Sequence, residues 1–233
     1  MTSVFLRKEL KRHSDPYKAK ILQRFFKTGP GEYAEGDIFI GINVPVLRAL
    51  AKKYQNLPLD ETTRLLRSRI HEERLLSLLI LILKYRKADL MGKREIYRVY
   101  LKNSMHINNW DLVDVTAKQI VGDYLYDKDR RKLYQLARSG SLWQRRIAVL
   151  STFHFIGKGD HEDALKIARI LLSDEHDLIH KAVGWMLREV GKCDIRAEEN
   201  FLDKYHRRMP RTMLRYAIER FPEKKRQGYL RAK

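Results

Sequence analysis

A weak internal repeat is the feature that most constrains how this chain can fold. Short segments that begin with a basic residue recur at Arg146, Lys181 and Arg215, which are 35 and 34 residues apart, and Arg74 lies 72 residues, or two periods, before Arg146. Each period holds about two helices, which is typical of a stack of helix pairs. Because one such pair cannot bury its own apolar face, we predict a curved solenoid with one continuous core, a single domain over residues 1–233.

Helical periodicity supports this prediction along most of the chain. Apolar residues recur at helical spacing in four stretches, 110–125, 142–155, 164–172 and 178–190. Strict alternation of apolar and polar residues is absent. The segment 38–42 has the length of a short strand, but its flanks favour a buried loop between helices. We therefore expect an all-α protein whose repeats are irregular and HEAT-like, because the period is slightly short for HEAT repeats.

The chain carries a large excess of positive charge. Lys and Arg number 48 against 29 Asp and Glu, which gives a formal net charge of +19. Such a charge repels itself unless a polyanion compensates it, and phosphates that pair with Lys and Arg release counterions in a way that favours binding. Nucleic acid is the favoured partner, while acidic membranes and acidic protein partners remain alternatives.

Cysteine content and hydropathy indicate the compartment. Cys193 is the one cysteine, so no disulfide framework and no cysteine-based zinc site can form within the chain. The N-terminal residues lack the apolar core of a signal peptide, and the longest apolar stretch, 75–83, is far too short to span a bilayer. We expect a cytoplasmic protein without a membrane partner.

The basic anchors of the repeat suggest a binding surface. In a stack of helix pairs one helix of each pair lines a common face, so Arg74, Arg146, Lys181 and Arg215 are expected there, spaced to follow a phosphate backbone. The alternative is that each cation caps or solvates its own helix.

Tryptophan is rare and its sequence surroundings are polar. Trp110 and Trp143 each open a predicted helix, and Trp185 lies within one, all beside polar or basic residues. A partly exposed indole can stack or pack on bases and sugars. A tryptophan in a helical protein is more often a core residue, so both interpretations stay open.

Two acidic residues follow Trp110. Asp111 and Asp114 lie in the first turns of the helix predicted after Asn108 or Asn109, either of which can serve as its N-cap, and acids there complement the helix dipole. A carboxylate that stabilises positive charge on a deoxyribose during loss of its base would look the same. Both roles remain open for Asp114 on these grounds.

One histidine pair has metal-ligand spacing. His176 and His180 are four residues apart, but no third ligand is evident and Lys181 adjoins the pair, so we expect no metal. No nucleotide-binding glycine motif and no serine nucleophile motif is found in the sequence.

Several segments together resemble a known family. They keep their order across nearly the whole chain: 39–45 (FIGINVP), 110–114 (WDLVD), 143–150 (WQRRIAVL) and 179–189 (IHKAVGWMLRE). The second segment resembles the Trp-Asp-x-Val-Asp motif of the AlkD-like DNA alkylation repair family, which consists of HEAT-like-repeat DNA glycosylases. The others resemble its Gly-Ile-x-x-Pro loop, its Gln-Arg-x-Ala helix and its Gln-Lys-Ala-Ile-Gly-Trp helix.

The resemblance implies a role for particular residues. Asp114 would be the catalytic carboxylate, and Trp110 and Trp185 would pack against the deoxyribose and backbone of the lesion nucleotide. Arg146 would hold the nearby phosphate or position Asp114. The resemblance also implies that Asn43, Arg48 and Arg188 contact the DNA backbone. Lys181, one of the basic anchors of the repeat, is expected to do the same.

The resemblance also implies a reaction. Members of the family excise cationic alkylated purines, chiefly N3-alkyladenine and N7-alkylguanine, from duplex DNA and leave the lesion stacked, which begins base excision repair. We expect a monofunctional glycosylase that acts as a monomer, needs no cofactor and is associated with the nucleoid when bound to DNA. The alternative is a non-catalytic helical-repeat protein that binds nucleic acid or serves as a scaffold, and burial of both Trp110 and Trp185 in the core would favour it.

Two positions depart from the family pattern. Asn109 stands where the family has an aromatic residue before the first tryptophan, and Phe25 stands where a close relative has tyrosine. Any contact made by that tyrosine hydroxyl is therefore absent here.

Overall fold

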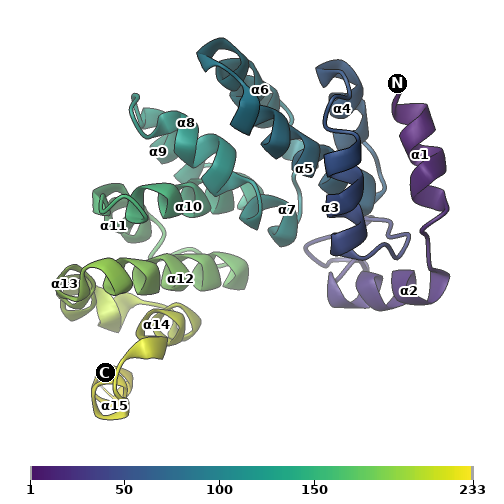
Figure 1. Cartoon of the computed structure of the whole chain (residues 1–233). Helices are drawn as coiled ribbons and strands as arrows, with labels where there is room; N and C mark the ends of the chain where they lie inside the picture. Colours follow the sequence, from purple (N-terminus) through teal and green to yellow (C-terminus); the bar gives the residue numbers. More distant parts are fainter. Residues whose placement is uncertain (1, 232–233) are drawn as a thin grey trace. The chain divides into compact units, whose positions relative to one another are not determined.

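All regular structure in the described part of the chain is helical. The structure, a computed structural model, describes residues 2–231, and within them the one β-type contact recorded is an isolated bridge between Ile38 and Ile70 (Figure 1). The predicted all-α class is confirmed, and the segment 38–42 is a loop, as expected. The chain divides after Thr116 into two compact units.

The first unit is built around helix α5. Its helices are α1 (Ser3–Lys11), α2 (Pro16–Phe25), α3 (Val44–Lys53), α4 (Leu59–Leu66), α5 (His71–Lys87), α6 (Leu90–Lys102), the short η1 (Ser104–His106) and α7 (Trp110–Asp114). Helix α5 contacts α3, α4, α6 and α7. It is buried on nearly all sides, which its almost continuous apolar stretch predicts, because a helix that is apolar all round belongs in a core.

The second unit is a stack of helix pairs. Its helices are η2 (Lys118–Gly122), α8 (Asp123–Leu125), α9 (Arg131–Ala137), α10 (Leu142–Ile156), α11 (Glu162–Ile170), α12 (Asp177–Cys193), α13 (Ile195–Tyr205), η3 (His206–Arg208), α14 (Arg211–Ala217), η4 (Ile218–Arg220) and α15 (Glu223–Arg231). Helix α12 packs between α10 and α14, and α9, α11 and α13 contact these helices (Figure 1). The helix-pair repeat predicted from the sequence is therefore present in this unit.

Close packing within the stack depends on a glycine. A Cβ atom added at Gly184 of α12 would lie 2.4 Å from the carbonyl oxygen of Met213 and 2.5 Å from the Cβ of Tyr216, both in α14. Any side chain there would push the two helices apart. Within the Gly-Trp pair of the α12 motif, Gly184 therefore has a structural role, because it allows α14 to pack closely against α12.

The basic anchors do lie at one phase of the repeat, each at the fourth or fifth position of its helix in α5, α10, α12 and α14, but they do not form an exposed row. Arg74 is 2% exposed and Arg146 is 5% exposed. Arg74 donates to Asp37 Oδ2 at 2.7 Å and to the Ser68 carbonyl at 3.0 Å, and Arg146 donates to the Leu178 carbonyl. The expectation of a shared phosphate-tracking face is therefore wrong for Arg74 and Arg146, because the core helices that carry them are buried where the anchors lie.

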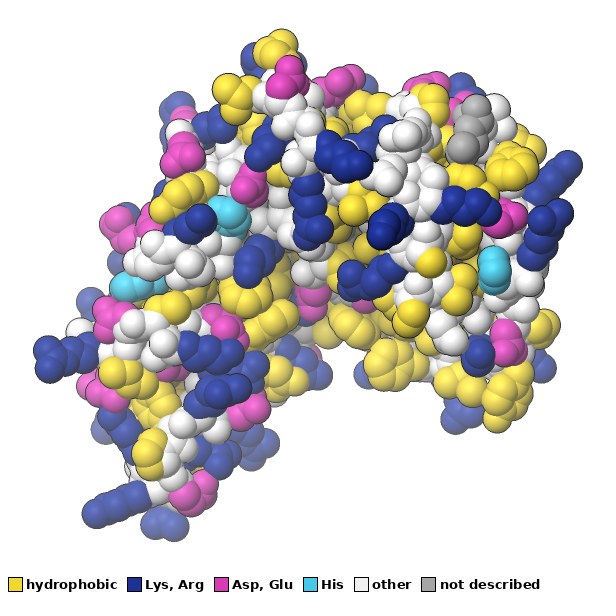
Figure 2. All heavy atoms as spheres, in the orientation of Figure 1, with side chains coloured by type: hydrophobic (Ala, Val, Ile, Leu, Met, Phe, Trp, Pro, Cys, Tyr) yellow, Lys and Arg dark blue, Asp and Glu magenta, His cyan; other side chains and the backbone are white. Residues whose placement is uncertain are grey.

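Positive charge is instead spread widely. Figure 2 shows Lys and Arg side chains over both units on the face drawn, interspersed with fewer acidic ones. Lys181 is half-buried and Arg215 is exposed. Across residues 2–231 no helix combines the length and apolar character needed to cross a membrane.

Candidate active site

Helix α7 carries two of the predicted catalytic residues. The side chain of Asn109 accepts a hydrogen bond from the backbone N–H of Trp110 at 2.8 Å, so Asn109, one of the two residues predicted as N-cap, begins this five-residue helix. Trp110 and Asp114 are four residues apart and therefore lie on one face of α7. Both are partly exposed.

Asp114 lies beside a buried tyrosine. The hydroxyl of Tyr100 is 2.8 Å from the Thr116 hydroxyl, and Thr116 in turn donates to the Leu112 carbonyl. Burial, together with the negative charge of Asp114, raises the pKa of Tyr100 well above its usual range. The phenol therefore stays neutral, and it fixes the end of α7 through Thr116.

Trp110 packs onto a column of aromatic rings. Its indole stacks on Phe26 at 5.1 Å, Phe26 stacks on Phe39 at 4.9 Å, and Phe39 stacks on the His71 ring at 4.3 Å. One face of the indole is thus held by the protein while the residue stays partly exposed. This fits the prediction of a half-exposed indole.

Helix α2 presents further apolar side chains beside this column. Tyr17, Ile21 and Phe25 are spaced four residues apart on one face, and all three are exposed. Figure 2 shows hydrophobic side chains gathered over α2. Phe25, which replaces the tyrosine of a close relative, is 62% exposed and meets Trp110 edge-on at 6.0 Å, so its ring contact does not need a hydroxyl.

A buried polar cluster lies behind α7. His71 Nε2 is 2.8 Å from Asp111 Oδ2 and His71 Nδ1 is 3.3 Å from Asp37 Oδ2. Asp37 also accepts hydrogen bonds from Arg74 at 2.7 Å and from Asn109 at 3.5 Å. Burial opposes ionisation of Asp37, but the hydrogen bond from His71 and the charge of Arg74 outweigh it, so the pKa of Asp37 is lowered.

The loop before α3 is tied to the start of α5. The carboxylate of Glu72 accepts hydrogen bonds from the backbone N–H groups of Ile40, Gly41 and Ile42 at 2.7–3.3 Å. Gly41 has φ of 84°, and a Cβ there would lie 2.1 Å from the Asp15 carbonyl oxygen. The Gly-Ile-x-x-Pro segment therefore has a structural role, since it seats Phe39 and lets α2 approach.

In the second unit, α12 carries Trp185. Its indole Nε1 donates to Glu189 Oε1 at 3.0 Å, and its ring meets Phe153 of α10 edge-on at 5.6 Å. The ammonium of Lys118 lies 3.7 Å from the centre of the Phe153 ring. Trp185 is half-buried, like Trp110, whereas Trp143, which we did not place in the site, is buried in the core.

The remaining predicted residues divide into paired and exposed groups. Lys181 pairs with Asp177 at 2.6 Å, and Arg188 pairs with Glu219. Asn43 and Arg48, at the start and middle of α3, are exposed. The first unit thus holds Trp110, Asp114, Asn43 and Arg48, and the second holds Arg146 on α10 with Trp185, Lys181 and Arg188 on α12.

The histidine pair of α12 has helix-terminal contacts. His176 Nδ1 accepts the backbone N–H of Leu178 at 3.1 Å, so it caps α12, and His180 Nε2 lies against the carbonyl of Asp174. In the part of the chain that the structure describes, no group of three His, Cys, Asp or Glu side chains is arranged to hold a metal ion.

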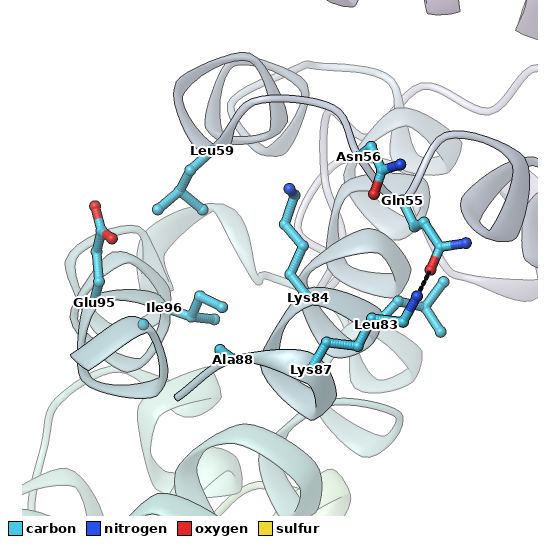
Figure 3. Close-up of a pocket in the computed structure, with 10 residues that line it drawn as sticks. Gln55, Asn56, Leu59, Leu83, Lys84, Lys87, Ala88, Glu95 and Ile96 are labelled. Atoms are coloured by element: carbon cyan, nitrogen blue, oxygen red, sulfur yellow. Dashed lines mark hydrogen bonds between the residues drawn. The ribbon is translucent and has the colours of Figure 1, made fainter. Parts of the chain in front are cut away.

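One pocket lies at the other end of α5 from His71. It measures about 310 Å³ and is lined by residues of α5, α6 and the α3–α4 loop, among them Lys84, Gln55 and Glu95 (Figure 3). Lys84 extends into it, and burial lowers the pKa of this amine. None of the predicted site residues lines this pocket.

Sequence reasoning missed the cluster of His71, Asp37 and Asp111. A usable signal was present, because α5 opens with four ionisable residues, 71–74, and continues as an apolar helix. Ionisable groups at the start of a buried helix require partners. Arg74 was instead interpreted through its similarity to the other repeat anchors.

Comparison with known proteins gives the class. The sequence matches the family described as DNA alkylation repair enzyme over residues 6–221, so the chain belongs to that family. Among solved structures it is similar to one titled "Predicted DNA alkylation repair enzyme from Enterococcus faecalis", with a TM-score of 0.69 and 16% identity, over 91% of this chain and 98% of that one. That likeness supports the helical-repeat fold. A comparison with curated proteins finds no match.

Proposed function

We propose that this protein is a monofunctional DNA glycosylase that hydrolyses the N-glycosidic bond of cationic alkylated purines, N3-alkyladenine and N7-alkylguanine, in duplex DNA. Membership in a DNA alkylation repair family supports a role in repair. The observation that carries the finer proposal is the pairing on α7 of a partly exposed indole with a carboxylate on the same face, Trp110 with Asp114.

The chemistry asks little of the protein beyond that carboxylate. An alkylated purine already bears positive charge, so when the bond from C1′ to the base nitrogen breaks, the base takes both electrons and leaves neutral. Positive charge develops on the deoxyribose, and a carboxylate beside C1′ stabilises it. Water then bonds to C1′ and gives up one proton, which Asp114 accepts, and an abasic site remains.

Two residues of the second unit are also proposed to act in the reaction. We propose that Trp185 packs against the sugar and backbone of the lesion nucleotide, and that Arg146 has the positioning role toward Asp114 that the family resemblance implies, without a direct phosphate contact. Arg146 is buried and donates to the Leu178 carbonyl, so it would act by fixing neighbouring groups and not by contact with solvent-exposed DNA. On this proposal residues 1–233 act as one DNA-binding domain.

Charged residues of both units would hold the duplex. Arg48 and Asn43 are exposed and accessible to a phosphate backbone. Lys181 and Arg188 would exchange their carboxylate partners for phosphates. The net charge of +19 supports a polyanionic partner. We propose a monomer that works in the cytoplasm, on the nucleoid, and begins base excision repair.

The decisive experiment follows the product. Purified protein is incubated with a duplex containing one N7-methylguanine, and both the released base and the strand are analysed. The proposal predicts free N7-methylguanine and an unbroken strand that is cleaved at the lesion position only after alkali. An unmodified duplex is the control. Binding without release of the base would contradict the proposal and support a non-catalytic helical-repeat protein.

A further inference from the structure

The geometry points to a positioning residue that no motif identifies. We infer that His71 is held as a doubly protonated imidazolium between Asp37 and Asp111, and that this ion fixes the orientation of α7, which carries Trp110 and Asp114. The catalytic consequence rests on the proposed glycosylase function. The ionisation itself rests only on the first unit.

The first argument is the number of donors. Carboxylate oxygens face both ring nitrogens of His71, Asp111 Oδ2 at 2.8 Å from Nε2 and Asp37 Oδ2 at 3.3 Å from Nδ1. A neutral imidazole has one N–H, so one of its nitrogens would direct a lone pair at a carboxylate. Only the imidazolium donates to both, and charge-assisted hydrogen bonds are the stronger kind.

The second argument is the charge of the buried cluster. Asp37 and Asp111 face His71 from the preceding loop and from α7, while α5 itself contributes Arg74 one turn later. Glu72 is directed away, to the backbone amides of 40–42. With His71 charged, two cations balance two carboxylates. With His71 neutral, one of the two carboxylates in this largely buried cluster would lack a cationic partner, which is costly.

The third argument is that His71 reaches α7 by two routes. Through Asp111 it contacts the first turn of α7 directly. Through the aromatic column of Phe39 and Phe26 it supports the inner face of the Trp110 indole. An imidazolium stacked on Phe39 is also favoured by the negative face of that ring.

The ionisation equilibrium agrees with this arrangement. Burial among aromatic rings lowers the pKa of His71, and Arg74 lowers it further, but the carboxylates of Asp111 and Asp37 outweigh both, so the pKa of His71 is raised. At any given pH near neutrality, His71 is therefore protonated to a greater extent than a histidine in water.

The first test needs no variant. Protein labelled with ¹⁵N in its histidines is titrated by NMR from pH 5 to 10. The inference predicts one histidine with both ring nitrogens protonated at pH 7.5, and its titration should shift the indole resonance of Trp110. Contacts with the stacked Phe39 ring, 4.3 Å away, assign the His71 signal in the wild-type protein, and its absence from the spectrum of His71→Gln, which keeps a donor but no charge, checks the assignment. A His71 ring that is neutral at pH 7.5 would overturn the inference.

The second test measures the catalytic consequence. His71→Gln should lower the single-turnover rate of N7-methylguanine release roughly tenfold to hundredfold, because small displacements of reacting groups cost that much, and leave duplex affinity within about twofold. The matched control is His161→Gln, since His161 also faces a carboxylate, that of Asp194 at 3.6 Å, but lies in the second unit. Its rate should equal that of the wild type.

The outcomes separate the two claims. If wild-type protein releases no base, the glycosylase proposal fails, and the NMR titration still decides whether His71 is an imidazolium. If wild-type and His71→Gln proteins release base at equal rates, the glycosylase proposal stands and the positioning role is overturned. If the variant loses its native circular dichroism, the NMR result on the wild-type protein alone decides.

Discussion

The two units hold their predicted site residues in contrasting ways. In the first unit, the helix that carries Trp110 and Asp114 is anchored by a buried cluster of His71, Asp37 and Asp111. In the second unit, the cations of α12 pair with carboxylates that are largely exposed: Asp177 with Lys181 and Glu219 with Arg188. The histidine of the first arrangement is buried, whereas the carboxylates of the second are open to solvent.

The difference indicates a division of work. Buried hydrogen-bonded charges hold one geometry, because breaking them leaves an uncompensated charge. Exposed ion pairs such as Lys181 with Asp177 contribute little to stability, about 0–1 kcal/mol, so a phosphate can replace the Asp177 carboxylate at small cost. We therefore expect the His71 cluster behind α7 to govern the chemical step, and the α12 cations Lys181 and Arg188 to contribute to affinity for DNA.

The largest expected effect comes from removing Asp37, the carboxylate that the buried cluster shares. Asp37→Ala leaves His71 and Arg74 without their shared carboxylate, so the free energy of unfolding should fall by about 3–5 kcal/mol. The matched control, Glu219→Ala, removes an exposed partner and should cost less than about 1 kcal/mol. Urea denaturation measures both. Equal losses would contradict the contrast.

A second substitution tests how much the close packing of α12 against α14 stabilises the second unit. Gly184→Ala places a methyl group 2.4 Å from the Met213 carbonyl oxygen and should cost about 1–3 kcal/mol in the free energy of unfolding. Gly228→Ala in α15 is the control, because a Cβ there meets nothing within 4 Å and alanine favours a helix. A Gly184→Ala protein as stable as the wild type would show that α14 is free to move away.

The contribution of the buried His71 cluster to stability should depend on pH. Because the folded-state pKa of His71 is raised, its stabilising contribution is fully present below about pH 6.5 and is lost as the pH rises through the raised value, with a slope of up to about 1.4 kcal/mol per pH unit. Burial lowers the pKa of His106, His154 and His176, which has the opposite sign. The quantity to measure is therefore the difference in unfolding free energy between wild-type and His71→Gln proteins. A difference that does not shrink as pH rises from 6.5 would refute this prediction.

The smallest expected effect concerns the affinity for DNA. Lys181→Gln should weaken binding to methylated and unmethylated duplexes alike and reduce the slope of log affinity against log salt by about one unit. The single-turnover rate at saturating protein should stay near that of the wild type. A loss of rate with unchanged affinity would assign Lys181 to the chemical step. That result would contradict its proposed role in DNA affinity.

Much of the fold was predictable from local patterns. Long helices with apolar residues at helical spacing, such as α10 and α12, were indicated by periodicity, and the phase of the repeat is correct. Asn109, one of the two residues predicted as N-cap, also begins α7. These features depend on residues close together in the chain.

The parts that escaped prediction depend on distant partners. Arg74 resembles Arg146 in sequence, yet its environment is set by Asp37, which lies 37 residues away in a loop. His71 likewise meets Asp111 from 40 residues away. Burial and pairing of this kind are properties of the assembled core, and a single sequence shows the charges without showing which of them meet.

On the proposed function, the carboxylate of Asp114 is what makes this protein an enzyme. The most direct test of this role is the single-turnover release of N7-methylguanine from duplex DNA by the Asp114→Asn variant, with duplex affinity measured on the same samples. The account predicts that release falls by about a thousandfold or more while affinity changes little. Release at the wild-type rate by Asp114→Asn would contradict it.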